Sequence, residues 1–270
     1  MSSTQTLPAN PVRLKSVAIP SEHGGWGFLL EPLILGLLLA PTAAGLGITL
    51  GTAGAFLARH PLKLAVADWR RGRRFARTRL AEQVAAAYVL IALLGLVLAI
   101  ALAGPGILAP LLIAIPLGLL QLAFDFRGQS RHLLPELAGP VALATSATMI
   151  ALAGGWQLQP ALLLTLLLTA RAIPSILYVR ARLRLSKGQP AWPAAAILCH
   201  LAGVALVAAL AAAGLTPWLA FIALSILTLR AAWVLQQRHR DVPARVIGFL
   251  EIGFGLLTAL LIAAGYAFHL

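Results

Sequence analysis

LLLTARAIPSILYVRARLRLSKGQ (residues 166–189) is the stretch that decides the fold. It begins as an apolar helix, carries Arg171 at a depth where a bilayer makes charge costly, and ends in a run of cations that starts at Arg180. A guanidinium inside a membrane span costs about 2.5–3.5 kcal/mol on insertion scales, so Arg171 needs a partner or a function. Anchoring at the membrane surface explains residues 180–187, but Arg171 lies roughly two turns further in, at about 5.4 Å per turn.

The composition around this stretch is that of a membrane protein, with 60% hydrophobic and 11% charged residues. The 24 Gly and 17 Pro predict closely packed, bent helices. The net charge of +13 lies in short basic segments between hydrophobic runs, which argues against a nucleic-acid partner. The single cysteine, Cys199, cannot form an intrachain disulfide. No segment has the pattern of a cleaved signal peptide.

Nine segments are long and apolar enough to span a bilayer, which takes about 20 residues. They lie near residues 19–40, 42–66, 81–103, 107–125, 133–154, 160–179, 193–213, 216–236 and 246–268. Helices satisfy every backbone group without water, and no segment alternates like a barrel strand. We therefore predict an all-α polytopic bundle, with residues 1–18 as a polar N-terminal segment and residues 19–270 as one nine-helix transmembrane domain.

The charges between these segments fall on alternating sides. The connections around residues 41–42, 104–106, 154–160 and 214–216 contain no Lys, Arg, Asp or Glu. The arginines of the other connections, with Arg13 and Lys15 of the N-terminal segment, fall on the opposite side. The positive-inside rule therefore predicts that the N-terminus and the arginine-rich connections are cytoplasmic and that the C-terminus is outside.

Ionisable groups within the spans are candidates for function. Glu31 follows His23 by eight residues, so both share roughly one helix face. The sequence leaves three interpretations of Glu31 open: a hydrogen-bonded group of the bundle, a functional acid, or the partner of Arg171. We predict that Glu31 and Arg171 both lie in the bundle interior. Glu251 is a third such group, and Arg230, near the end of its segment, is interpreted as an interfacial anchor.

Arginines gather at the predicted cytoplasmic ends in pairs one helical turn apart. The planar fork of arginine forms bidentate hydrogen bonds with phosphate or carboxylate and keeps its charge. We predict that an anion, such as a phosphate, a carboxylate or an anionic lipid head group, is bound by Arg127, Arg131, Arg171, Tyr178, Arg180 and Arg184. The competing interpretation is that these arginines only anchor the protein to anionic membrane lipids.

Three motifs carry a family resemblance. PSEHGGWGFLLEPLILG, RGQSRHLLPELAG and ARAIPSILYVRARLR, which occur in this order, resemble the YwiC-like family of bacterial integral membrane proteins. The resemblance implies a location in the bacterial inner membrane. It implies no settled biochemical activity.

More distantly, the layout is similar to that of UbiA-type intramembrane prenyltransferases. This resemblance implies nine helices, with aspartate-rich loops after helices two and six that hold Mg²⁺ on an isoprenoid diphosphate. Aligned on Asp68, the first motif has Pro61 and Leu64 where aspartates belong. The positions of the second motif are Leu177, Arg180 and Arg184. Mg²⁺ requires oxygen ligands, so we expect no metal and no cofactor.

Three functions are compatible with these features. The leading interpretation is a binding or accessory membrane protein that holds an anionic amphiphile, a lipid or an isoprenoid-like molecule, in a cytoplasm-facing cavity. A divergent, metal-independent lipid transferase is the first alternative, in which His23, Glu31 or Glu136 would supply acid–base catalysis. A small-molecule transporter is the second, with Glu31 and Arg171 as its coupling or substrate residues.

The charge distribution generates a topological prediction. Reporter fusions after Leu158 and Leu270 should report an external location and a fusion after Gly128 a cytoplasmic one, because the uncharged connections lie opposite the arginine-rich ones. Paired cytoplasmic and periplasmic reporters measure this directly. A cytoplasmic C-terminus would contradict the count of nine spans.

Overall fold

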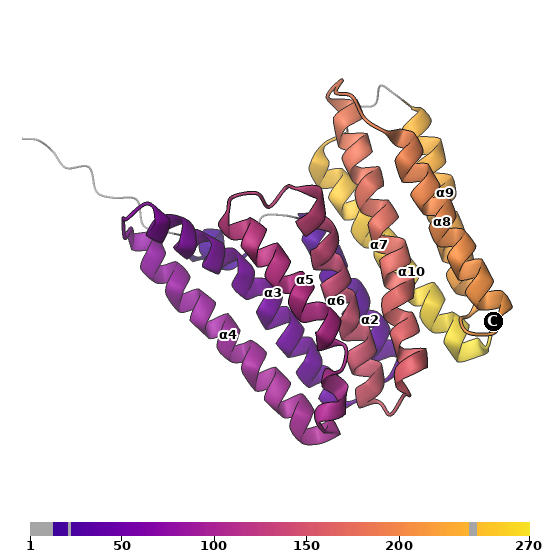
Figure 1. The fold of residues 1–270 in the computed structure, drawn as a ribbon, viewed down its shortest axis with the longest axis horizontal. Helices are drawn as coiled ribbons and strands as arrows, with labels where there is room; N and C mark the ends of the chain where they lie inside the picture. Colours follow the sequence, from indigo (N-terminus) through magenta and orange to yellow (C-terminus); the bar gives the residue numbers. More distant parts are fainter. Residues whose placement is uncertain (1–12, 21–22, 238–241) are drawn as a thin grey trace, which may run out of the picture.

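The computed structural model describes residues 13–20, 23–237 and 242–270, and within these ranges the chain is helical and contains no strand (Figure 1). A short helix, α1 (Leu14–Ala18), comes first. The long helices are α2 (His23–Leu39), α3 (Ala43–Arg70), α4 (Ala76–Ala103), α5 (Leu111–Phe126), α6 (Leu133–Ala153), α7 (Leu158–Ser186), α8 (Pro193–Ala212), α9 (Trp218–Gln236) and α10 (Ala244–Phe268). A 3-10 turn, η1 (Pro105–Leu108), precedes α5.

Each long helix occupies one of the nine predicted segments, but three of them extend clearly beyond the predicted boundary. Helix α4 begins at residue 76, whereas its apolar segment begins near residue 81. Helix α3 continues to residue 70 and α7 to residue 186, whereas the apolar segments end near residues 66 and 179. The extensions are rich in Arg, Leu and Ala, which are good helix formers. Glycines with positive φ, Gly72 and Gly188, follow α3 and α7. Arg180 and Arg184 therefore stand on a helix and not in a loop.

Lipid must surround much of this bundle. Six of the described helices, α4 and α6 to α10, are long and apolar enough to cross a membrane. Helices α2 and α5 are apolar but shorter, and α3 carries charges in its last third. The apolar window of α4 has a mean hydropathy of 2.8 and is only 17% buried. An apolar helix with so little protein around it needs lipid on its free faces. The protein is therefore a multi-pass integral membrane protein.

Helices α3 and α4 are in direct backbone contact. A Cβ atom on Gly95 would lie 2.5 Å from the carbonyl oxygen of Gly47 and 2.6 Å from the amide nitrogen of Gly51. Small residues allow such approach in membranes, where packing and not the hydrophobic effect holds helices together. Helix α4 packs along α3, with further contacts to α1 and η1. The α3–α4 pair therefore forms an arm beside the remaining helices (Figure 1).

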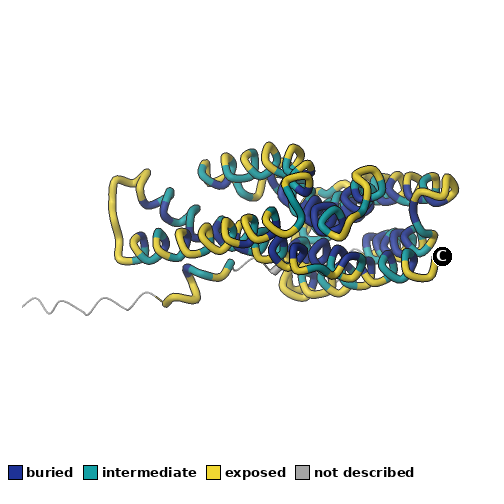
Figure 2. Tube along the Cα trace, turned by 90° about the horizontal axis from the view of Figure 1, so that it is seen from below, coloured by how far each residue is buried: buried dark blue, intermediate teal, exposed yellow. Residues whose placement is uncertain are grey.

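The core lies away from this arm. Its largest buried cluster is built from α2, α6, α7, α8, α9 and α10 and includes Leu35, Leu167 and Ile262. Helix α10 packs against α2, so the first and the last of the long helices meet in the core. Figure 2 shows the same division, with buried segments gathered inside the bundle and exposed ones along its outer faces.

The connections sort by charge between the two ends of the bundle. The arginine-bearing α3–α4, α5–α6 and α7–α8 connections lie at the upper end in Figure 1, which we call the charged end. The uncharged α6–α7 and α8–α9 connections and the C-terminus lie at the lower end. Arg238 and Arg240 lie outside the described residues.

The glycine contact yields a prediction about stability. Gly95→Ala should lower the free energy of unfolding by about 1–3 kcal/mol, because backbone atoms on both sides leave no room for a methyl group. Gly253→Ala is the control, since a Cβ at Gly253 meets no atom within 4 Å. Thermal unfolding in detergent compares the two variants. Equal melting temperatures would show that the close contact is not strained by a methyl group.

Candidate functional site

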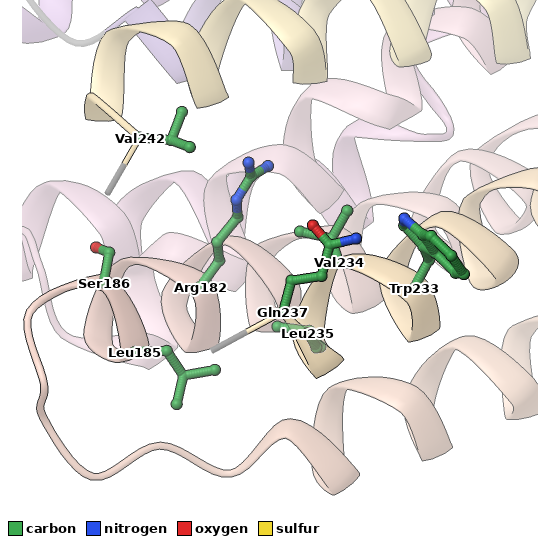
Figure 3. A pocket seen from close by; sticks show the side chains of 8 residues that line it. All are labelled: Arg182, Leu185, Ser186, Trp233, Val234, Leu235, Gln237 and Val242. Carbon is green, nitrogen blue, oxygen red and sulfur yellow. The ribbon is translucent and has the colours of Figure 1, made fainter. Parts of the chain in front are cut away.

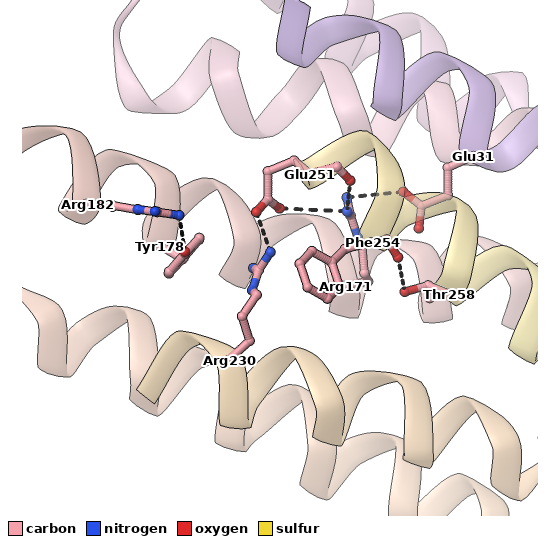
Figure 4. Close-up of polar contacts among 8 residues, drawn as sticks. All are labelled: Glu31, Arg171, Tyr178, Arg182, Arg230, Glu251, Phe254 and Thr258. Carbon is pink, nitrogen blue, oxygen red and sulfur yellow. Dashed lines mark hydrogen bonds and ion pairs between the residues drawn. The ribbon is translucent and has the colours of Figure 1, made fainter. Parts of the chain in front are cut away.

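Arg171 lies in the middle of the bundle and is 2% exposed. Its Nη1 is 3.1 Å from Oε2 of Glu31, which is 3% exposed. Its Nη2 donates to the backbone carbonyl of Glu251 at 2.9 Å and is 3.8 Å from Oε2 of the same residue (Figure 4). The prediction that Glu31 and Arg171 lie in the bundle interior is confirmed. Of the three interpretations of Glu31, the ion-pair partner of Arg171 is the one that the contacts bear out.

Glu251 joins this pair to a second arginine. Arg230 donates from Nη1 to Oε1 of Glu251 at 2.5 Å (Figure 4). The Arg230 guanidinium also lies 4.3 Å from the ring centre of Tyr178 and 4.4 Å from that of Phe254. Aromatic faces on a desolvated guanidinium are stabilising. The interpretation of Arg230 as an interfacial anchor is therefore wrong, because its side chain is only 11% exposed and points inward. We call Glu31, Arg171, Arg230 and Glu251 the polar centre.

A cavity of about 1070 Å³ lies between the α3–α4 arm and helices α2, α5, α6, α7 and α10. Drug-sized ligands occupy pockets of about 300–1,000 Å³, so the cavity is large enough for a lipid-like molecule. Its apolar wall includes Ile48, Leu96, Leu111 and Met149. Its charged lining residues are Arg59, Arg131, Glu136, Arg180, Lys187, Arg245 and Glu251. We call it the main cavity, and the part lined by residues at the charged end its mouth.

Two arginines at the mouth already have carboxylate partners. Arg180 donates from Nη1 to Glu136 and also to the backbone carbonyl of Arg131, at 3.1 Å for the latter. Arg59 donates to both carboxylate oxygens of Asp125. These contacts tie α7 to the α5–α6 connection and α3 to the end of α5. Both arginines therefore help to fix the shape of the mouth.

Free positive charge at the mouth comes from other side chains. Arg131 and Lys187 are exposed, and neither side chain has a hydrogen-bond or ion-pair partner in the described part of the chain. The Arg245 guanidinium lies 5.5 Å from the ring centre of Phe249. Lining cations outnumber lining carboxylates by five to two among the described residues. An anion would therefore be attracted to the mouth.

The other predicted site residues lie elsewhere. Arg127 and Arg184 are exposed and do not line the main cavity, so the one-turn spacing does not bring Arg184 to the cavity beside Arg180. Tyr178 is fully buried in the contact with Arg230 and is not a lining residue. His23 begins α2, and its side chain lies outside the described part of the structure.

Aspartates at the charged end are also bound by arginine. Asp68 accepts hydrogen bonds from Nε and Nη2 of Arg77 and from the hydroxyl of Thr78, at 3.0, 2.5 and 2.8 Å. These bonds, that from Arg77 first, hold the pKa of Asp68 below its ordinary value. Among residues 13–20, 23–237 and 242–270, no group of three or more His, Cys, Asp or Glu is placed to hold a metal ion.

A second, smaller pocket of about 230 Å³ lies between the ends of α7, α9 and α10. Figure 3 shows Arg182, Trp233 and Gln237 among its lining residues. Its volume is below the range of about 300–1,000 Å³ that is usual for ligand sites. The main cavity is therefore the candidate functional site.

Sequence reasoning missed three residues of this site. Gln121, Lys187 and Arg245 line the main cavity. Lys187 stood out only as part of the run of cations that starts at Arg180, which was interpreted as an anchor at the membrane surface. Gln121 and Arg245 gave no separate signal, because a lining position depends on which helices become neighbours.

The polar centre predicts the effect of removing its arginine. Arg171→Leu should cost about 3–5 kcal/mol of stability, because it leaves Glu31 without its ion-pair partner in a buried site. Arg184→Leu removes an exposed arginine from the same helix and should change stability little. Unfolding by denaturing detergent measures both. Equal stability of the two variants would contradict a structural role for the ion pair.

A comparison with protein families supports the resemblance in the sequence. The family described as YwiC-like protein matches residues 19–151, which contain Glu31, Arg59, Arg131 and Glu136. No curated protein and no solved structure matches the chain. Residues 19–151 of the chain are therefore similar to the YwiC-like protein family.

Proposed function

We propose that this protein binds an anionic amphiphile, a lipid or an isoprenoid-like molecule, in the main cavity. The observation that carries the proposal is that one cavity combines a long apolar wall with a cationic mouth. An apolar chain and an anionic head group on one molecule would match these two regions. A soluble anion would leave the apolar wall without a partner, and a neutral lipid would leave the cations without one.

The apolar wall is long enough for a lipid chain. Along α3 the lining runs from Arg59 to Ile48, which is about 16 Å at 1.5 Å per residue. Along α6 it runs from Glu136 to Met149, or about 20 Å on the same basis. Helix α4 contributes the half-exposed Leu93 to the lining. The chain of the amphiphile would therefore lie along the helices, with its end toward the middle of the membrane.

The head group would meet Arg131 and Lys187, whose charges no described carboxylate neutralises. Charge-assisted hydrogen bonds from these side chains suit phosphate, carboxylate or sulfonate oxygens. Arg180 would then act mainly by holding the Arg131 backbone through its carbonyl. This assigns the anion to different cations than the paired arginines Arg180 and Arg184.

We further propose that all nine long helices cross a bacterial inner membrane, with the charged end in the cytoplasm and the C-terminus outside. The sorting of charged and uncharged connections between the two ends supports this orientation. Short helices α2 and α5 would cross the membrane beside longer ones, and the layout would be similar to that of UbiA-type proteins. The main cavity would then open toward the cytoplasm.

Two observations favour binding over the alternative functions. Of the candidates for acid–base catalysis whose side chains are described, Glu31 does not line the main cavity and Glu136 is engaged by Arg180, which argues against a lipid transferase. None of the described lining residues belongs to the connections at the uncharged end, which argues against a transport path through the bundle. A binding or accessory role requires neither a free acid nor a second opening.

The experiment combines ligand identification with a charge test. Native mass spectrometry of the gently solubilised protein should reveal a bound anionic amphiphile. A fluorescent single-chain alkyl sulfonate, tested in nanodiscs of neutral lipid, should bind about tenfold or more weakly to Arg131→Gln/Lys187→Gln, because each charged hydrogen bond contributes about 1.5–3 kcal/mol. The matched control, Arg127→Gln/Arg184→Gln, removes two exposed arginines outside the cavity.

Equal loss of sulfonate affinity in both double variants would contradict the proposal, because it would show a general effect of net charge. An uncharged alkyl alcohol that binds as tightly as the sulfonate would also contradict it. Added EDTA should leave binding unchanged, since the proposed contacts use cationic side chains.

A further inference from the structure

The polar centre is balanced in charge and lies deep in the bundle. Its two carboxylates and two guanidiniums come from four helices, α2, α7, α9 and α10. Glu31, Arg171 and Glu251 are 3%, 2% and 7% exposed. A Cβ on Gly255 would lie 2.9 Å from Oε2 of Glu31, so the backbone of α10 closes over the pair. With all four groups ionised, the charges cancel.

Hydrogen bonding within the centre is incomplete. Five buried atoms of the centre have no hydrogen-bond partner among the described groups: Oε1 of Glu31, Nε of Arg171, Nε and Nη2 of Arg230, and Oε2 of Glu251. Each such atom costs about 1–3 kcal/mol when it stays unsatisfied. Both donors and acceptors are among these atoms. A buried water molecule forms two to four hydrogen bonds and can satisfy both kinds of atom. The centre is therefore suited to hydration.

Glu251 belongs both to the centre and to the main cavity. It accepts from Arg230 on one side and lines the cavity on the other. Arg245, a cation of the same helix, also lines the cavity and lies six residues earlier, about 9 Å along the axis at 1.5 Å per residue. That separation is within the Debye length of about 8–10 Å for ordinary salt, and low dielectric weakens screening further. An anion held near Arg245 would therefore act on the charge of Glu251.

We propose that the polar centre is a proton-binding site linked by water to the main cavity, so that an anion and a proton bind together. This inference rests on the proposed function. When its four groups are ionised, the centre has no net charge and offers an entering anion no net attraction. A proton taken from solvent by the Glu251–Glu31 pair leaves one net positive charge in the centre, which the anion offsets. The proton belongs to the coupled pair of carboxylates.

Charged groups on the neighbouring helices surround Glu251 in the polar centre. Helix α2 presents Glu31, helix α7 presents Arg171 and Tyr178, and helix α9 presents Arg230. Helix α10 itself contributes Arg245 one to two turns away. The carboxyl groups of Glu31 and Glu251 are the acids through which this centre would bind a proton.

The sign of the linkage follows. If binding takes up one proton, the affinity for the anion rises as the pH falls, by up to about tenfold per pH unit. By reciprocity, the factor by which a bound proton strengthens anion binding equals the factor by which a bound anion strengthens proton binding. Binding driven by the mouth cations alone would show no such dependence.

The experiment measures sulfonate binding as a function of pH in nanodiscs of neutral lipid. An alkyl sulfonate is the probe because its own charge does not change between about pH 6 and pH 8, unlike that of a phosphate, whose second pKa is about 6. Wild-type affinity should fall as the pH rises. Calorimetry in buffers of different ionisation enthalpy should report proton uptake. Glu251→Gln should remove both effects, whereas Glu82→Gln, which removes a carboxylate of α4 outside the main cavity, should keep them.

The outcomes separate the two proposals. Sulfonate binding that is independent of pH, with no proton uptake by the wild type, overturns the proton site and leaves amphiphile binding intact. Proton uptake that persists in both Glu251→Gln and Glu31→Gln also overturns it, because the proton then goes elsewhere. Absence of sulfonate binding at every pH overturns the proposed function and this inference with it. The wild-type measurement decides the matter even if Glu251→Gln does not fold.

Discussion

The ion pair between Arg171 and Glu31 is the constraint on which the arrangement of the bundle depends. Neither side chain can face hydrocarbon at mid-depth, so α7 and α2 must turn these faces inward. Glu251 extends the constraint to α10, and its bond with Arg230 extends it to α9. Lipid tails are as apolar as leucine, and apolar faces alone would specify helix neighbours weakly in a bilayer. The buried charges supply that specificity.

The main cavity results from the way in which the α3–α4 arm packs. Glycine contacts hold its two helices tightly to each other, while polar contacts at the charged end, such as Arg59 with Asp125 and Lys63 with Ser130, tie α3 to the helices beside it. Space remains between the arm and those helices. The same contacts fix cations around the opening of that space. Architecture and charge distribution therefore have a common origin in a few side chains of α3, α5 and α7.

The sequence predicted the positions of the helices well because the length and position of each apolar segment can be read directly from it. It also predicted that Arg171 needs an interior partner, since the cost of a charge in hydrocarbon does not depend on neighbours. It could not assign Arg230 to Glu251, because that pairing requires α9 to lie beside α10. The sequence also could not show that Arg180 lines the cavity and Arg184 does not. Helical spacing shows that two residues are neighbours on a helix, but it does not show which of them faces a cavity.

The pairing of the first long helix with later ones has a consequence for biogenesis. Glu31 precedes Arg171 by 140 residues, so at about 5–20 residues per second it emerges from the ribosome roughly ten seconds before its partner. Helix α10, which packs against α2 and carries Glu251, is made after the other described helices. The insertion machinery must therefore tolerate an acidic α2 without its cation while α3 to α6 and the first half of α7 are synthesised. The contact between α2 and α10 therefore forms only after the helices between them have been synthesised.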